Sequence, residues 1–89
     1  MSNDLKEIKD YIGYLPEKDY NKASELLKSR SFEALYYLVR SSLFLARKAS
    51  IKKEPLCDKD DKPIDTDVLE YLLTIIESYY SEVDPDFLN

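Results

Sequence analysis

Residues 31–50 read SFEALYYLVRSSLFLARKAS, and this stretch decides the class of fold. Apolar side chains recur in it every three or four residues, which is the spacing of one face of an α-helix. The main face consists of Phe32, Leu35, Tyr36, Val39, Leu43 and Ala46. Further apolar side chains widen it or lie on other sides: Tyr37, Leu38, Phe44, Leu45 and Ala49. Because this helix is apolar around most of its circumference, we expect it to lie at the centre of a helical domain or at an interface.

Two shorter helical patterns precede this stretch. Residues 4–12 carry an apolar stripe and are followed by Gly13, the only glycine of the chain. Glycine is the usual residue where a helix ends in the left-handed conformation, so we expect Gly13 to end this helix in that way. Residues 16–29 begin with Pro16, which fits the first position of a helix because its missing N–H would have no partner there. The sequence therefore predicts two short N-terminal helices.

A fourth helical pattern covers residues 66–83, and its inner stripe consists of Leu69, Leu72, Ile76, Tyr79 and Val83. Asp65 and Asp67 are both candidates for its N-cap, and Asp67 with Glu70 has the spacing of a capping box. We expect Pro85 to end this helix because proline cannot continue one.

Residues 51–64 connect the two long helices. Pro55 and Pro63 exclude a helix there, and the segment is longer than most connections in compact domains. It forms either a loop or a short hairpin that turns at Lys59–Lys62. Since 89 residues are enough for one domain, the predicted fold is a single all-α domain that resembles a small four-helix bundle.

The charges are divided along the chain. Residues 28–53 carry seven bases and one acid, whereas residues 54–89 carry eleven acids and two bases. The net charge of the whole chain is −5. A chain polarised in this way folds its opposite charges against each other, associates with a copy of itself, or binds a charged partner. Free nucleic acid is an unfavourable partner because binding to its backbone needs a dominant basic surface.

Rare and absent residues exclude several classes of function. The chain has no histidine, one glycine and one cysteine, Cys57. This composition excludes a histidine-based catalytic triad, the usual zinc sites, a glycine-rich phosphate loop and an internal disulfide. We therefore expect a protein that is not an enzyme and has no cofactor and no metal site. The lack of a secretory signal pattern and of a sufficiently long apolar run predicts a cytoplasmic protein with no membrane partner.

The candidate site combines aromatic and basic residues of the two long helices. It consists of Tyr36, Tyr37, Arg40, Phe44, Arg47, Lys48, Lys52, Lys53, Tyr79 and Tyr80. Tyrosine is common at interfaces because it buries a large area and keeps a polar tip, and one member of each tyrosine doublet must face away from the core if the other faces in. In the simpler interpretation, the bases complement the helix dipole and pair with nearby acids, and the tyrosines lie at the edge of the core.

Three functions fit this chain. The first is a protein–protein interaction module that associates with itself or with a host or structural partner through the two long helices. The alternative is a site for a small anionic ligand such as a nucleotide, held by the bases Arg40, Arg47, Lys48, Lys52 and Lys53. The third is an acidic mimic of nucleic-acid phosphates that occupies a basic partner. The composition, which is acidic, tyrosine-rich and poor in glycine, resembles that of many small phage and mobile-element proteins and assigns no site.

Overall fold

The computed structural model describes residues 3–83, and their regular structure is helical apart from one isolated β-bridge. The elements are α1 (Asn3–Tyr11), the short 3₁₀ helix η1 (Ile12–Tyr14), α2 (Glu17–Lys28), α3 (Phe32–Ile51) and α4 (Thr66–Val83). The predicted all-α class is confirmed, and each helix begins and ends within one residue of its predicted position. Pro85, the expected end of the last helix, lies outside the described residues. Within residues 3–83, no helix combines the length and the apolarity needed to cross a bilayer.

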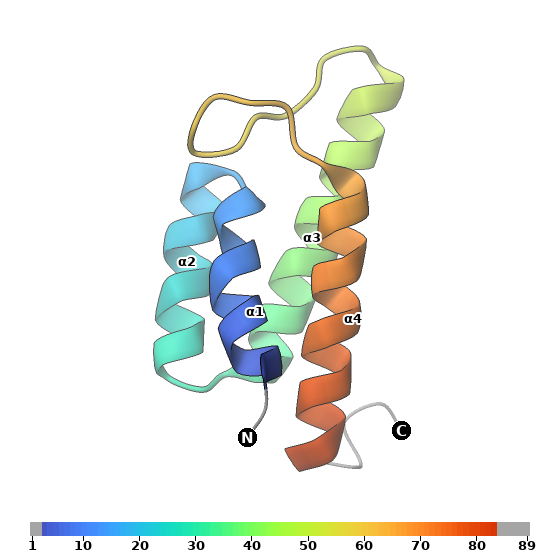
Figure 1. Ribbon diagram of the computed structural model, residues 1–89. Helices are drawn as coiled ribbons and strands as arrows, with labels where there is room; N and C mark the ends of the chain where they lie inside the picture. Colours follow the sequence, from blue (N-terminus) through green and yellow to red (C-terminus); the bar gives the residue numbers. More distant parts are fainter. Residues whose placement is uncertain (1–2, 84–89) are drawn as a thin grey trace.

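The two long helices, α3 and α4, run antiparallel side by side and share the largest contact of the fold (Figure 1). α1 packs against α4, and α2 packs against α3. The two short helices make little direct contact with each other. Each short helix is therefore held mainly by the long helix that it covers.

The core lies where the helices meet. Its fully buried large side chains are Ile8, Leu15, Leu35, Val39, Leu69, Leu72 and Ile76. α3 and α4 supply five of these seven residues, all of them on the faces that the apolar spacing predicted. Among the described residues one polar side chain, that of Ser42, is also buried: its hydroxyl donates a hydrogen bond of 2.7 Å to Oδ2 of Asp19 and so ties α3 to the first turn of α2.

The prediction for Gly13 is wrong. Gly13 lies in the middle of η1, and among the described residues no glycine has a positive φ. η1 continues directly from the last turn of α1, and its end is closed by a hydrogen bond of 3.1 Å from the Leu15 N–H to the Ile12 carbonyl. Because the chain stays right-handed through this turn, no left-handed residue is needed.

Non-glycine residues occupy the left-handed positions instead. Arg30, Lys53 and Asp61 have φ values of 59°, 61° and 63°. Arg30 and Lys53 each lie two residues beyond a helix end, where a Schellman motif places its left-handed residue. The Ser31 N–H donates to the Leu26 carbonyl at 2.8 Å after α2, and the Glu54 N–H donates to the Ala49 carbonyl at 3.0 Å after α3.

The residues that cap the N-termini of α4 and α2 differ in part from those that the sequence predicted. Oδ1 of Asp65 accepts hydrogen bonds from the N–H groups of Asp67 at 3.0 Å and Val68 at 3.3 Å, so Asp65 caps α4. Asp67 lies inside the first turn, and its expected capping box with Glu70 is not formed. Pro16 is the N-cap of α2 rather than its first residue.

The connection between α3 and α4 forms the short hairpin rather than an open loop. The Asp58 N–H donates to the Lys62 carbonyl at 2.7 Å, and the Ile64 N–H donates to the Leu56 carbonyl at 2.9 Å. These bonds enclose the antiparallel bridge between Cys57 and Pro63. Proline is tolerated there because residues of a non-hydrogen-bonded pair direct their N–H groups away from the partner strand.

Candidate interaction surface

The outer side of α3 carries an uncovered apolar stripe. Tyr37, Phe44 and Ile51 follow one another at intervals of seven residues, and they are 52%, 66% and 83% exposed. Seven residues are close to two helical turns, so these three side chains lie on one side of α3. We call these three residues the outer α3 stripe. Leu45, which is also exposed, widens the apolar area beside Phe44.

α3 leaves this side open because its opposite side is the one that packs. Leu35, Val39 and Leu43 are buried in the core between α3 and its neighbours. α4 and α2 both lie against α3, whereas α1 lies against α4. α2 and α4 therefore cover the inner face of α3, and the outer α3 stripe is left to solvent.

Basic side chains flank this stripe. Arg40, Arg47 and Lys48 are exposed on α3. Arg40 and Arg47 are also seven residues apart, so a basic row runs beside the apolar row. Between α3 and α4 this surface is hollowed into a groove of about 400 Å³, lined by Tyr36, Arg40, Leu43, Phe44, Arg47, Glu70, Leu73, Thr74 and Glu77. We call it the α3–α4 groove.

One of the predicted basic residues has a partner within the chain. Nη2 of Arg47 lies 2.7 Å from Oε1 of Glu70 on α4. This pair matches the simpler interpretation, in which acids near the start of the last helix neutralise the bases of α3. Both side chains are about half exposed, so the pair adds little to stability. Its main effect is to fix the Arg47 guanidinium at the edge of the groove.

The outer surface of α4 has the opposite charge to that of α3. α4 contains no lysine or arginine, and its acids are Asp67, Glu70, Glu77 and Glu82. Glu70 and Glu77 line the α3–α4 groove, and Asp67 and Glu82 are exposed beyond it. The basic and the acidic parts of the sequence therefore form two adjacent surfaces. The surface of α3 is basic and aromatic, and the surface of α4 is acidic.

The four tyrosines of the candidate site have different environments. Tyr36 is half-buried and Tyr37 is exposed, as the doublet predicted, and their ring centres are 5.4 Å apart. Tyr79 and Tyr80 are both half-buried, with ring centres 5.0 Å and 6.0 Å from that of Phe32. Tyr79 and Tyr80 therefore lie at the edge of the core, and Tyr37 is the tyrosine of the set that is open to solvent.

The two lysines at the end of α3 do not join the other bases in one groove. Lys52 is the C-cap of α3, and Lys53 is the left-handed residue that follows it. Neither lines the α3–α4 groove. The structure thus brings together Tyr36, Arg40, Phe44 and Arg47 and places Lys52 and Lys53 beyond them.

Sequence reasoning missed two exposed residues. Ile51 was assigned to the loop, although its seven-residue spacing from Phe44 was readable. Tyr71 on α4 was not selected, and its hydroxyl donates a hydrogen bond of 3.2 Å to Oε2 of Glu7 on α1, with the Tyr11 ring centre 5.5 Å away. The negative charge of Glu7, and then this hydrogen bond, raise the pKa of Tyr71 above the ordinary value for a tyrosine. Although it is exposed, Tyr71 therefore contacts two residues of α1.

Comparison with known proteins assigns no relative. No protein-family model matches the chain, and neither a curated protein nor a solved structure matches it.

Proposed function

We propose that this small, bundle-like helical domain is a protein–protein interaction module whose contact surface is the outer α3 stripe with the adjoining α3–α4 groove. The observation that carries the proposal is the run of exposed apolar side chains at Tyr37, Phe44 and Ile51. Single exposed apolar residues are ordinary, but a row of them on one helix face is typical of a surface that a partner covers. Phe44 lies at the middle of the row, where interface residues contribute most to binding.

The basic side chains beside the outer α3 stripe determine which charge the partner surface must carry. If two copies met antiparallel through α3, with Phe44 at the centre, Arg40 of one copy would face Lys48 of the other. Like charges placed opposite each other are unfavourable, so the α3 surface disfavours its own copy in that arrangement. An acidic helix is the favourable partner for α3.

Such an acidic helix exists within this chain. The outer surface of α4 carries acids and no base, so α3 of one copy is complementary to α4 of a second copy. The same chemistry also fits an acidic helix of a host or structural partner. The first experiment is therefore to measure the mass of the purified protein by sedimentation velocity over a range of concentrations, with association expected to increase with concentration.

A pair of variants separates the apolar stripe from the rest of the surface. Phe44→Ser should weaken association about tenfold or more, because truncating a central aromatic residue commonly costs more than 1.4 kcal/mol of binding free energy, about the value of one factor of ten. Tyr14→Ser removes another exposed aromatic side chain, one that lies in η1, and should leave association unchanged. Equal effects of the two substitutions would contradict the assignment of the surface to α3.

A second pair tests the charges. Arg40→Glu with Lys48→Glu should weaken association and flatten its dependence on salt. Neither residue is in an ion pair among the described residues, whereas replacing Arg47 would also break its contact with Glu70. Lys18→Glu with Lys22→Glu makes the same change in net charge on exposed positions of α2 and serves as the control. If the control weakened association as much, net charge rather than the α3 surface would be responsible.

A further inference from the structure

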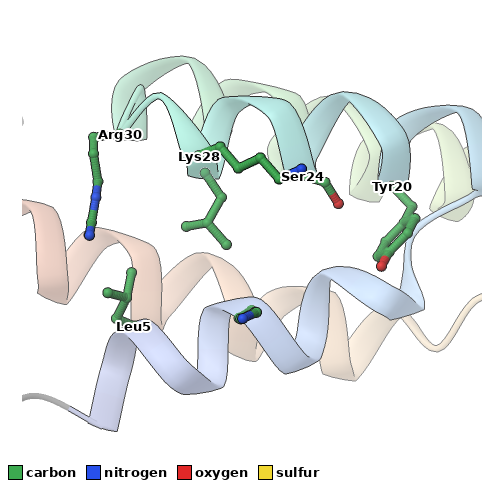
Figure 2. Close-up of a pocket in the computed structure, with 7 residues that line it drawn as sticks. Leu5, Tyr20, Ser24, Lys28 and Arg30 are labelled. Atoms are coloured by element: carbon green, nitrogen blue, oxygen red, sulfur yellow. The ribbon is translucent and has the colours of Figure 1, made fainter.

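A second groove lies between α1 and α2, on elements that the proposed interaction surface does not use. Its volume is about 450 Å³, and it is lined by Leu5, Lys9, Tyr20, Ser24, Leu27, Lys28 and Arg30. Figure 2 shows Arg30 and Leu5 at one end of the groove, Tyr20 at the other, and Ser24 and Lys28 between them along α2. We call it the α1–α2 groove.

The packing of the fold explains why this groove is open. α1 lies on α4 and α2 lies on α3, so the two short helices make little direct contact. η1 and the following turn join them at one end only. The space between them is therefore a consequence of the way the two short helices cover two different long helices.

The charges that line the groove are all positive. Lys9, Lys28 and Arg30 are its ionisable side chains apart from the Tyr20 phenol, and no carboxylate lines it. In the part of the chain that the structure describes, none of these three cations forms an ion pair. In a chain with a net charge of −5, three cations gathered without an acid form a local site of opposite sign, complementary to an anion.

Arg30 lines the groove from a backbone conformation that is unfavourable for a residue other than glycine. Its φ of 59° is in the left-handed region, where glycine is the preferred residue. From this position its side chain extends from the end of α2 toward α1 and ends near Leu5 (Figure 2). The guanidinium group presents paired N–H donors, a geometry that matches a phosphate.

Apart from Ser24, the rest of the lining is apolar or aromatic. Leu5 and Leu27 come from the facing helices, and Tyr20 supplies an aromatic ring at the end away from Arg30. Nζ of Lys59 in the hairpin, which does not line the groove, lies 5.5 Å from the centre of the Tyr20 ring. A cavity of several hundred Å³ with an apolar lining and a few polar groups is of the size and kind that binds small molecules.

We propose that the α1–α2 groove binds a small organic phosphate that carries a planar apolar body, a ligand the size of a mononucleotide. The phosphate contacts Arg30 at one end of the groove, Lys9 and Lys28 add positive charge along it, and the planar body lies along Leu5 and Leu27 toward Tyr20. This site differs from the anion site predicted at the end of α3, because Lys52 and Lys53 are not part of it.

The binding test uses adenosine 5′-monophosphate as the probe and records amide NMR spectra of the isotope-labelled protein. Saturable shifts are expected at Leu5, Lys9, Ser24 and Leu27, with weaker binding of adenosine and of inorganic phosphate. Equal binding of adenosine would contradict the role of the cations, and equal binding of inorganic phosphate would contradict the role of the apolar lining. An unchanged spectrum, or shifts confined to Lys52 and Lys53, would overturn the proposal.

A matched pair of variants then tests Arg30. Arg30→Gly and Lys53→Gly each remove one positive charge, and each places glycine at a left-handed position that favours it. Both should fold, but only Arg30→Gly should weaken binding of adenosine 5′-monophosphate, by about tenfold, the usual effect of losing one charged hydrogen bond. Equal losses in the two variants would assign the binding to net charge and refute the site.

Discussion

The two faces of α3 are both apolar, but only one of them is covered. The inner face buries Leu35, Val39 and Leu43 against the other helices, whereas the outer face exposes Tyr37, Phe44 and Ile51. Both faces follow from the same twenty residues of sequence, and both have helical spacing. The hydrophobic content of a helix face therefore does not determine whether the face is buried. A face is buried only if the rest of the chain supplies a surface to cover it.

The largest expected difference between the two faces is in stability. Leu35→Ala should lower the free energy of unfolding by about 2–5 kcal/mol, because it leaves a cavity beside side chains that cannot fully close it. Phe44→Ala on the outer face should change it by no more than about 0.5 kcal/mol, since a surface side chain is removed. Urea denaturation of both variants checks this prediction. At a concentration where sedimentation shows a monomer, a large loss in Phe44→Ala would mean that the outer face is covered within the single chain.

A smaller difference in the free energy of unfolding is expected between substitutions of two neighbouring serines. Ser42 is buried and donates to Asp19, whereas Ser41 is exposed. Ser42→Ala should cost about 1 kcal/mol more than Ser41→Ala, because the comparison cancels the gain in helix propensity and leaves the lost hydrogen bond. Thermal or urea denaturation provides the measurement. Identical stabilities would show that the Ser42 hydrogen bond makes no net contribution.

The ion pair between Arg47 and Glu70, at the edge of the α3–α4 groove, should contribute still less to stability. A double-mutant cycle with Arg47→Ala and Glu70→Ala is expected to give a coupling energy of about 0.2–1 kcal/mol, since both side chains are half exposed. The coupling should decrease as salt is added. A coupling of several kcal/mol that is independent of salt would indicate that this pair is shielded from water, contrary to the exposed groove described above.

The smallest expected contribution to stability is that of the contact between Tyr71 and Glu7. Because Glu7 raises the pKa of Tyr71 above its value in the unfolded chain, the contribution of their contact to stability is fully present below the unfolded pKa. It is lost as the pH rises through the folded pKa, where the charged phenolate faces the Glu7 carboxylate. Glu7→Gln should lower the pKa of Tyr71, which a titration followed by tyrosinate absorbance or NMR measures. An unchanged titration would rule out the contact.

The sequence predicted the extent of the helices, but not all of the residues that cap them. Periodic apolar spacing located α3 and α4 because it reports which residues share a face. Gly13 misled the prediction because composition cannot show that the chain would continue into η1, or that Arg30 and Lys53 would take the left-handed positions. For the candidate site, the sequence indicated that one tyrosine of Tyr36 and Tyr37 faces outward, but not that Tyr79 and Tyr80 both pack beside Phe32.

The all-α class, the extent of the four helices in residues 3–83 and the division of charge all follow from the sequence alone, because each depends on residues close together in the chain. Only the tertiary structure decided which apolar face of α3 stays open, and that Arg47 pairs with Glu70 while Arg40 does not. It also decided that Lys9, Lys28 and Arg30 line one groove. These features depend on which helix covers which, and that arrangement is set by the simultaneous packing of distant segments in one core.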